Sequence, residues 1–340
     1  MSKEVIVIGA GAAGMESAGQ LAKFGVKVKL FEKDPDLGGH LKGWYRLFPN
    51  RRDSKEVLEY LNKGLNNSNI EVLTGKTVSN IEKNGSSFIV KTEDGNSWNA
   101  DSVLVTTGFD LFKSERKEEY GYGIYDNVIS SADLEKMFRN GEIKCANGSV
   151  PSTVGFLHCV GSRDEKVGNF YCSKLCCISA VKQAIEVKEH LPESKVFCFY
   201  MDIRMTGAGY EEMYREAQQK YGVTFIRGKL SEVSENMEGK LCIKAEDTLV
   251  GKPLRMKLDM LVLMAGMEMS ATGSKLAKNA GLALGDNRFL SPADHHFASN
   301  KGNKDGIFYA GTCTSPMSAT DTISHARAAV EEVLDYLKLR

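Results

Sequence analysis

Apolar and polar positions at the start of the chain follow the pattern of a βαβ unit. Within Lys3–Gly9 the run Val5–Ile8 is apolar, and Lys27–Glu32 carries apolar Val28, Leu30 and Phe31. Between them, Gly14–Phe24 carries apolar positions at helical spacing. Strands joined through a helix run parallel, because the crossover returns the chain to the same end of the sheet. The sequence therefore predicts a parallel α/β sheet at its beginning.

An alternating pattern follows this unit. Residues 74–105 alternate as short strands with turns at Asn84-Gly85 and Asp94-Gly95, which predicts an antiparallel meander ending in the apolar run Ser102–Gly108. Residues 110–150 are charged and glycine-rich without a clear period. We interpret them as a linker and surface excursion with one helical stretch at 131–138.

A second βαβ pattern occupies the middle of the chain. It consists of a strand at Thr153–His158, a helix at about Cys177–His190 and a strand at Lys195–Met201. Two dinucleotide-type halves are therefore expected. Further helices are predicted at 209–221 and 318–337, and further strands at 223–226, 230–234, 241–246, 258–265 and 306–311.

Composition is that of a folded protein without a dominant surface charge. The 340 residues are 42% hydrophobic and carry 44 Lys plus Arg against 44 Asp plus Glu, so no net field favours nucleic acid or anionic lipid. No signal peptide precedes Val5–Ile8, and no apolar run approaches the roughly 20 residues of a membrane helix. We expect a cytoplasmic protein that neither binds nucleic acid nor inserts into a membrane, with its cysteines reduced.

The first motif is Gly9-Ala-Gly11-Ala-Ala-Gly14, followed by Glu32 at the end of the second strand. Its glycines permit a tight turn and the approach of a pyrophosphate to the helix N-terminus, while Glu32 can accept hydrogen bonds from a ribose. In this context the motif indicates dinucleotide binding.

Three later features favour FAD over NAD. The pair Gly38-Gly39 before His40 lets the chain pass close to the pyrophosphate, and Val103–Gly108 ends a strand in small residues after an inserted meander. Finally, the strand ending at Gly311 leads into a helix that Thr312 and nearby amides are expected to cap at the flavin end. The expected cofactor-binding residues are Gly9, Gly11, Ala12, Ala13, Gly14, Glu32, Lys33, Gly38, Gly39, His40, Leu41, Val78, Thr106, Thr107, Gly108, Gly311, Thr312, Asp321 and Thr322.

Four of the eight cysteines cluster in the second half. Cys159 follows a strand where a second glycine-rich loop would stand, and Cys172, Cys176 and Cys177 come at the start of the next helix. Soft thiolates suit iron–sulfur clusters or zinc, but the spacing matches neither common zinc sites nor the usual ferredoxin run. Spacing alone leaves open a cluster, a zinc site, a redox disulfide and inert buried thiols.

Several segments resemble the A subunit of heterodisulfide reductase. The resemblance runs over essentially the whole chain and is carried by Phe156-Leu-His-Cys159-Val-Gly-Ser-Arg163-Asp164-Glu165, Tyr171-Cys172-Ser-Lys-Leu-Cys176-Cys177, Tyr200-Met-Asp202-Ile-Arg204, Gly209-Tyr-Glu-Glu212, Phe225-Ile-Arg-Gly228, Gly121-Tyr-Gly-Ile-Tyr-Asp-Asn-Val128 and Ala310-Gly-Thr-Cys313. It implies an α/β, thioredoxin-reductase-like flavoprotein with two dinucleotide-binding domains. It also implies FAD and one [4Fe-4S] cluster with the metal ligands Cys159, Cys172, Cys176 and Cys177.

The domains expected from this resemblance are discontinuous. Residues 1–112 and 285–340 would form the Rossmann-like FAD-binding domain, and 113–150 the linker. Residues 151–284 would form the inserted, NAD-binding-like α/β domain that carries the cluster motif.

Departures from the family narrow the expected role. Asn50-Arg51-Arg52 stands where the longer methanogen form has a cysteine, and the chain has no ferredoxin-type cysteine runs, so one cluster is expected. The short form resembles the A-like subunit of the complex in sulfur-oxidising bacteria, which we favour, and the A subunit of the quinone-interacting membrane-bound oxidoreductase. Gly207-Ala208-Gly209 replaces the family's Gly-Lys-Gly, which argues against electron bifurcation.

Other residues have simpler interpretations. Cys198 and Cys242 are expected in the core, Cys145 as an exposed thiol, and Cys313 beside the flavin-end strand. The pair His295-His296 is expected in solvent. Two segments remain open: Trp44–Phe48 would either cover the flavin ring or pack on the surface, and Asp202–Arg204 would be the place for a nicotinamide cofactor, although its companion glycine loop is replaced.

The leading hypothesis is an electron-transfer oxidoreductase subunit in sulfur metabolism, in which FAD exchanges electrons with one [4Fe-4S] cluster. Partners implied by the resemblance are heterodisulfide-reductase-like B and C subunits and a second copy in a homodimer. The alternatives are a stand-alone NAD(P)H-dependent disulfide oxidoreductase and a zinc-stabilised flavoprotein scaffold.

Overall fold

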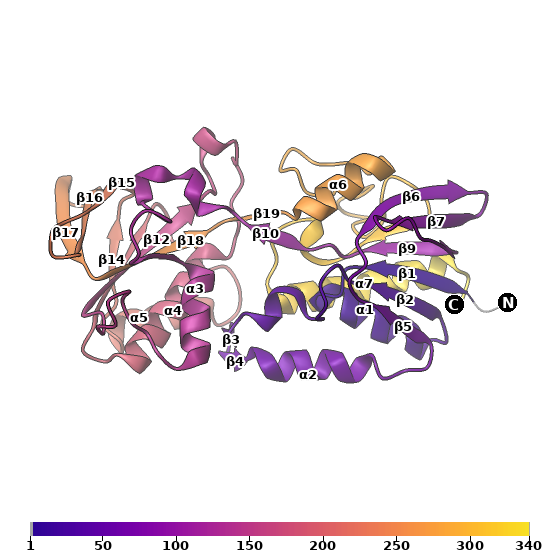
Figure 1. Ribbon diagram of the computed structural model, residues 1–340, viewed down its shortest axis with the longest axis horizontal. Coiled ribbons are helices and arrows are strands. Elements are labelled where there is room, and N and C mark those ends of the chain that lie inside the picture. The colour runs from indigo at the N-terminus through magenta and orange to yellow at the C-terminus, as the bar shows by residue number, and fades with distance from the viewer. Residues whose placement is uncertain (1–2, 340) are drawn as a thin grey trace. The chain divides into compact units, whose positions relative to one another are not determined.

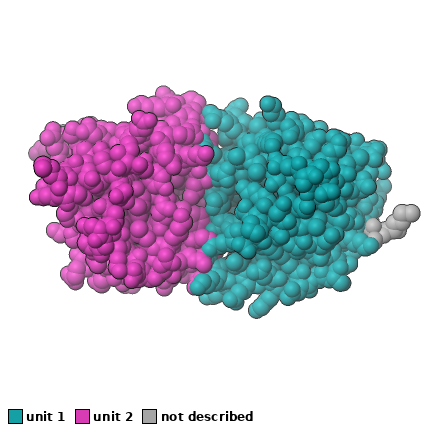
Figure 2. All heavy atoms as spheres, in the orientation of Figure 1, with its two compact units in different colours: residues 1–42, 54–110, 268–340 teal, residues 43–53, 111–267 magenta. Residues whose placement is uncertain are grey.

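The computed structural model describes residues 3–339, which fold into two compact units (Figures 1 and 2). Unit 1 is made of residues 1–42, 54–110 and 268–340, and unit 2 of residues 43–53 and 111–267. The chain therefore passes between the units four times. Two short strands, β10 (Phe109–Leu111) and β19 (Met267–Met269), run along two of these passages and pair with each other.

Unit 1 is built on a parallel five-stranded sheet in the order β20-β9-β1-β2-β5. Helix α1 packs against α2 and α7, while a meander of β6, β7 and β8 packs against α6. The sheet strands are β1 (Glu4–Ile8), β2 (Lys27–Phe31), β5 (Ile70–Leu73), β9 (Ser102–Val105) and β20 (Ile307–Tyr309). The other elements are α1 (Ala12–Lys23), α2 (Ser54–Gly64), α6 (Ala271–Ala280), α7 (Ala319–Tyr336), β6 (Val78–Asn84), β7 (Ser87–Thr92) and β8 (Ser97–Ala100).

Unit 2 is also built on a parallel five-stranded sheet, in the order β11-β18-β12-β13-β14. A separate antiparallel sheet joins β15, β16 and β17, and residues 43–53 contribute the small pair β3 and β4. The sheet strands are β11 (Val128–Ser130), β12 (Thr153–Val160), β13 (Lys195–Tyr200), β14 (Thr224–Arg227) and β18 (Met260–Ala265). The other elements are α3 (Ser131–Asn140), α4 (Cys176–His190), α5 (Tyr210–Gln219), β3 (Arg46–Leu47), β4 (Arg52–Asp53), β15 (Leu230–Glu235), β16 (Leu241–Asp247) and β17 (Lys252–Leu258).

Alternation along β18 shows why this strand is apolar throughout. Val262 and Met264 belong to the core formed with the helices, whereas Leu261 and Leu263 belong to the core formed with β15 and β16. Successive side chains of a strand point to opposite faces, so a strand covered on both sides needs an apolar residue at every position.

Residues 113–150 are not a surface excursion, which corrects the expectation for this segment. Strand β11 forms an edge of the main sheet of unit 2, and the Ser130–Asp133 capping box starts α3. Tyr120 and Phe138 are fully buried, and Cys145, expected in solvent, is only 7% exposed. A three-residue edge strand inside a polar stretch leaves too short a pattern for sequence periodicity to reveal.

The division into units departs from the expected domain boundaries in two further places. Residues 43–53 belong to unit 2, and residues 268–284, expected in the inserted domain, belong to unit 1 because α6 packs on the β6–β8 meander. No helix in residues 3–339 has the length and apolar character needed to cross a bilayer.

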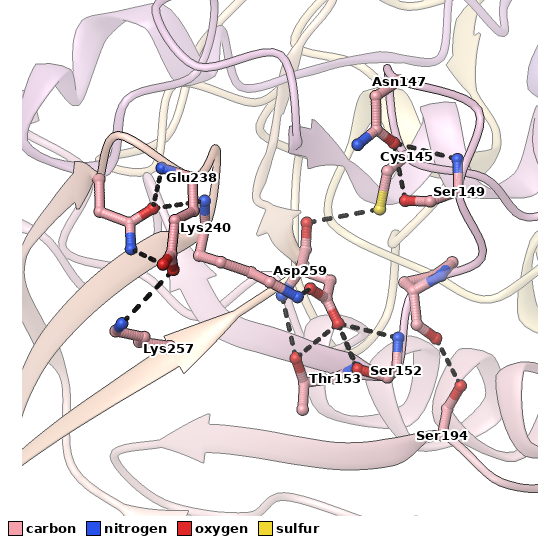
Figure 3. A network of polar contacts seen from close by, with 12 residues as sticks. Cys145, Asn147, Ser149, Ser152, Thr153, Ser194, Glu238, Lys240, Lys257 and Asp259 are labelled. Atoms are coloured by element: carbon pink, nitrogen blue, oxygen red, sulfur yellow. Dashed lines mark hydrogen bonds and ion pairs between the residues drawn. The ribbon is translucent and has the colours of Figure 1, made fainter.

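Asp259 fastens the strand beginnings of unit 2 together (Figure 3). Its Oδ2 accepts hydrogen bonds from the amides and hydroxyls of Ser152 and Thr153 at 2.6–2.9 Å, and Oδ1 pairs with Lys240. The Cys145 thiol donates to the Asp259 carbonyl oxygen at 3.7 Å. These contacts lie where β12 and β18 begin, which leaves the opposite, carboxyl ends of the parallel strands for ligand chemistry.

Candidate functional site

The glycine-rich turn of unit 1 joins β1 to α1. Gly9 has φ +102°, and a Cβ added at Gly14 would lie 1.8 Å from the Gly9 carbonyl oxygen, so both positions need glycine for the fold itself. A Cβ at Gly11 would meet nothing within 4 Å. No side chain caps the first turn of α1, whose amides are the groups that bind phosphate in such turns. Gly11 thus leaves space for a ligand at this helix N-terminus.

Glu32 fixes the end of β2 beside this turn. Its Oε2 accepts a hydrogen bond from the Ala10 amide at 2.7 Å, and Oε1 accepts one from the Asp34 amide at 3.0 Å. The side chain is buried. Each carboxylate oxygen can accept a second hydrogen bond, so Glu32 combines a structural role with the capacity to bind a ribose hydroxyl.

Gly38 and Gly39 bring the following loop back onto the turn. The Gly38 amide donates to the Ala10 carbonyl at 2.8 Å, and a Cβ on Gly39 would lie 3.2 Å from the Gly11 Cα. His40 is exposed; its Nε2 donates to the Phe109 carbonyl at 2.8 Å and its ring stacks on Phe109. The loop is therefore held close to the glycine-rich turn by backbone contacts that larger residues would prevent.

The glycine-rich turn, Glu32 and the Gly38-Gly39 loop together form a cradle for a dinucleotide, and the carboxyl end of β9 also contributes to it. The Thr106 hydroxyl donates to the Gly9 carbonyl at 2.7 Å, which ties the strand end to the turn. A Cβ on Gly311 would lie 2.7 Å from the Ala13 Cβ, so the segment after β20 passes close to α1. The other expected residues of this group lie in the same unit, with Leu41 and Val78 buried and Lys33 exposed.

Helix α7 begins differently from the expectation. Ser318, not Thr312, is its N-cap and accepts a hydrogen bond from the Asp321 amide at 3.0 Å. Thr312 lies in a short 3-10 turn, Gly311–Cys313, and is buried. Thr322 is buried in the first turn of α7. All nineteen expected cofactor-binding residues lie in unit 1, and all four clustered cysteines lie in unit 2.

Three of those cysteines meet at the carboxyl end of β12. Cys159 has φ +58°, unusual for a residue with a side chain, at an irregularity in the strand register, and Cys176 and Cys177 are the first residues of α4. The Cys159 and Cys176 sulfurs are 3.6 Å apart, and the Cys177 thiol contacts the Asp202 carbonyl at 3.5 Å. Cys172 is half-buried on the preceding loop and accepts a hydrogen bond from the Lys174 amide at 3.3 Å.

The surroundings favour thiolates at this place. The hydrogen bond from Cys176, with a smaller contribution from His158, lowers the pKa of the Cys177 thiol well below its usual value although burial opposes it. Cys176, the donor, has its pKa raised by its hydrogen bonds to Cys159 and Cys177. Thiolates are the form of cysteine that binds metals.

A cation lies beside the cysteines. The Arg163 guanidinium donates to Asp202 at 2.8 Å, and its Nη1 is buried without a hydrogen-bond partner in the part of the chain that the structure describes. Both ring nitrogens of His158 are likewise buried without such a partner there. Free thiols, a buried unpaired donor and a positive charge form an environment that suits an anionic metal–thiolate centre.

The thiols are nevertheless not spread into a finished coordination shell. Within residues 3–339, no group of three or more His, Cys, Asp or Glu side chains has the arrangement of a metal site. All eight cysteines are free of disulfides. The donor chemistry therefore fits a soft metal, and the sulfurs would have to separate to receive one.

The remaining candidates are structural. Cys198 and Cys313 are fully buried, and the Cys313 thiol contacts the Val105 and Ala310 carbonyls. Tyr45 and Phe48 pack against the core of unit 2, so this part of Trp44–Phe48 serves packing within that unit. Cys242 is only partly buried, and His295-His296 is exposed.

Sequence reasoning missed a buried charged group between α3 and α4. Glu135, Lys182 and Glu186 are each at most 3% exposed and are linked by ion pairs of 2.5 and 3.3 Å. Polar residues at helical spacing are ordinarily solvent-facing, so the signal available was only that two of them share α4 with apolar neighbours at Val181 and Ile185.

The first part of the chain matches a protein-family model. Residues 1–124 match the pyridine nucleotide-disulphide oxidoreductase family. Solved structures similar to the whole chain include the thioredoxin reductases of T. acidophilum, with a TM-score of 0.69 at 18% identity, and of Lactococcus lactis, with 0.68 at 17%. Each alignment covers 99% of both chains, which confirms the expected fold.

Curated relatives extend the match. The A subunit of the H(2)/formate:CoB-CoM heterodisulfide,ferredoxin reductase of Methanococcus maripaludis and the iron-sulfur A subunit of the CoB--CoM heterodisulfide reductase of Methanocaldococcus jannaschii are each 31% identical over 98% of this chain. The corresponding protein of Methanothermobacter thermautotrophicus is 38% identical over 67% of this chain and 36% of its own length.

This chain spans 64% of the length of the first two relatives. Their alignments run over 420 positions against 340 residues, so the relatives carry segments within the matched span that this chain lacks. The resemblance noted in the sequence is confirmed: the chain is a homologue of the heterodisulfide reductase A subunits, matched over nearly its whole length and built on the two-domain flavoprotein fold of the thioredoxin reductases.

Proposed function

We propose that the protein is an oxidoreductase subunit that passes electrons between FAD in unit 1 and one [4Fe-4S] cluster in unit 2. FAD would occupy the cradle of Gly11, Glu32 and Gly39, and the cluster would be held by Cys159, Cys172, Cys176 and Cys177. When bound, the flavin supplies two-electron exchange and the cluster one-electron transfer.

One observation carries this proposal. In unit 2, Cys159 at the end of β12 and Cys176 and Cys177 at the start of α4 lie on either side of the strand-to-helix connection that corresponds to the glycine-rich turn of unit 1. A dinucleotide needs glycines there for its pyrophosphate, whereas this connection offers thiolates. Unit 2 therefore has the same kind of strand-to-helix fold as unit 1, but it offers cysteine thiolates where a dinucleotide-binding unit offers glycines.

The residues of unit 1 argue against the alternative function, a stand-alone disulfide reductase. That activity needs a reactive cysteine pair near the flavin, and Cys313 is the one cysteine in the sequence of unit 1. It is fully buried, and burial raises the pKa of its thiol to about 12, so it is held as an unreactive thiol.

The proposed setting follows the relatives' names. The A subunit of a heterodisulfide reductase complex implies partner subunits, and we infer heterodisulfide-reductase-like B and C subunits, a homodimeric core and a cytoplasmic role in sulfur oxidation. The sulfur substrate would be handled by these partners.

Anaerobic purification with chemical analysis tests the proposal. We expect one flavin per chain, and about four iron and four acid-labile sulfide per chain. Redox titration followed by visible and EPR spectroscopy should resolve a flavin and a cluster. Cys176→Ala should lose iron and sulfide while keeping flavin. Cys198→Ala removes another buried thiol, which lies on β13, and should keep flavin, iron and sulfide.

Two outcomes would replace the proposal. Zinc without sulfide would show a zinc-stabilised scaffold. Fast flavin reduction by NADH with turnover of a small disulfide, and no iron, would show the stand-alone reductase.

A further inference from the structure

Arg163 is held in place by three structural constraints. It lies three residues beyond the end of β12 and adopts φ +52°, a left-handed conformation unusual for a residue with a Cβ. Its amide donates to the Tyr171 carbonyl at 3.0 Å, and its Nη2 donates to Asp202 Oδ2 at 2.8 Å. The backbone of Arg163 is therefore attached to the loop that carries Cys172, and its guanidinium is held by Asp202.

One side of this guanidinium has a partner and the other has none. Nη2 is paired with Asp202, whereas Nη1 is buried and makes no hydrogen bond within residues 3–339. A guanidinium stays charged in proteins and offers donors in a rigid fork, so the paired nitrogen fixes where the unpaired one points. An unpaired buried donor on a charged group is costly unless a further acceptor joins it.

The segments on either side of Arg163 carry two of the clustered cysteines. Burial lowers the pKa of Arg163, but Asp202, with smaller contributions from Cys159 and Cys172, raises it overall. Cys159, at the end of β12, precedes Arg163 by four residues. Cys172 directly follows Tyr171, whose carbonyl oxygen accepts a hydrogen bond from the Arg163 amide. The positive charge therefore belongs to the same loop region as two of the cysteines that would carry the metal.

Other arginines near Asp202 do not share this position. Arg204 and Arg227 approach Asp202 at 4.0 and 3.7 Å, with side chains 47% and 46% exposed, against 25% for Arg163. Solvent screens the charges of these two arginines more strongly. Arg204 therefore serves as a matched control with the same charge and the same carboxylate partner.

We propose that Arg163 is a positioning residue for the metal centre. Its Nη1 donates a hydrogen bond to the sulfur side of the centre held by Cys159 and Cys172, and Asp202 fixes the orientation of the guanidinium. This inference rests on the proposed function, because it assumes a thiolate-bound cluster. A positive charge and a donated hydrogen bond stabilise the more negative, reduced state, so Arg163 raises the reduction potential of the cluster.

The test measures potentials in the full chain purified anaerobically. Iron, sulfide and flavin are first quantified in the unaltered protein, and absence of iron and sulfide there would sink the proposed function itself. The midpoint potential is then determined by EPR-monitored titration with dithionite in R163Q, R163K and R204Q. We expect R163Q to shift the potential to more negative values, R163K to shift it less, and R204Q least.

The comparison with Arg204 decides the outcome. A shift in R163Q no larger than that in R204Q, with iron and sulfide retained, would overturn the proposal. If R163Q does not hold the cluster, R163K is compared with R204K on the same criterion, because both variants keep the positive charge. A larger negative shift in R163K supports the donor role, and equal shifts reject it.

Discussion

The ammonium group of Lys182 lies 2.5 Å from a carboxylate oxygen of Glu135, and neither side chain is more than 3% exposed. Lys182 also donates to the Arg46 carbonyl at 2.8 Å, while the Tyr45 amide donates to the other Glu135 oxygen at 2.7 Å. This buried pair therefore joins α3 and α4 to the segment 43–53, which follows the Gly38-Gly39 loop in the sequence.

Removing one member of this pair should destabilise the protein strongly. Lys182→Met leaves Glu135 as a buried charge without its cation, and we expect the free energy of unfolding to fall by about 3–5 kcal/mol. Lys136→Met is the control, because that lysine is 69% exposed in a surface pair with Asp133 and should cost less than about 1 kcal/mol. Chemical denaturation checks both, and equal losses would contradict the role assigned to the buried pair.

Glu186 should make stability depend on pH. Burial raises its pKa to about 7 from 4.5, with Lys182 opposing and Glu135 assisting the shift, and Arg46 also faces it. The folded state then binds a proton more tightly than the unfolded state, so stability falls as pH rises from about 4.5 to about 7 and stays lower above that.

Glu186→Gln should remove this dependence. The stability of the variant relative to the unaltered protein should rise between pH 5 and pH 8, by up to about 3 kcal/mol for this shift. Urea unfolding at both pH values measures the difference. A constant difference would show that Glu186 is ionised throughout.

Gly11 and Gly14 should respond differently to the same substitution. Gly11→Ala introduces a methyl group that meets nothing, at φ −77°, so we expect unchanged thermal stability of the flavin-free protein but weaker flavin retention. Gly14→Ala would press against the Gly9 carbonyl and should lower stability as well. Flavin content after gel filtration and thermal unfolding separate the two effects. Full flavin retention in Gly11→Ala would place the pyrophosphate elsewhere.

Asp259→Asn should weaken the strand beginnings of unit 2. Burial alone would raise the pKa of Asp259, but the hydrogen bonds from Lys240, Ser152 and Thr153 hold it well below its usual range. Its stabilising contribution is therefore present above about pH 4 and is lost as pH falls further. We expect the variant to lose about 2–4 kcal/mol at pH 7, because several hydrogen bonds to a charged acceptor are weakened.

The pH dependence supplies the check on that prediction. The difference between Asp259→Asn and the unaltered protein should shrink in acid, because the carboxyl group of residue 259 becomes protonated in the unfolded state before it does so in the folded state. A difference that stays the same from pH 7 to pH 3 would mean that the charge is not what stabilises this network.

The elements with strong periodicity were predictable from sequence. The first βαβ unit appears at Glu4–Phe31 and the second at Thr153–Tyr200, within two residues of the expected bounds. Both rest on long apolar strands and a helix of regular spacing, and such patterns are read reliably because tertiary packing and local propensity agree.

What escaped prediction depends on contacts distant in sequence. Val128–Ser130 becomes a strand only because β18, more than a hundred residues later, offers it an edge. Cys145 is buried through its contact with the Asp259 segment. The closeness of Cys159 and Cys176 was expected from the family resemblance, because their spacing alone left several interpretations open. The buried pair of Lys182 and Glu135 had no local signature.

The assignment of residues 43–53 and 268–340 to their units bears on how the polypeptide can fold during translation. All segments of unit 2 have been synthesised once residue 267 has left the ribosome, whereas β20 and α7 of unit 1 are still to come. The middle of the polypeptide can therefore complete its tertiary structure first, and the dinucleotide cradle can close only when β20 and α7 emerge.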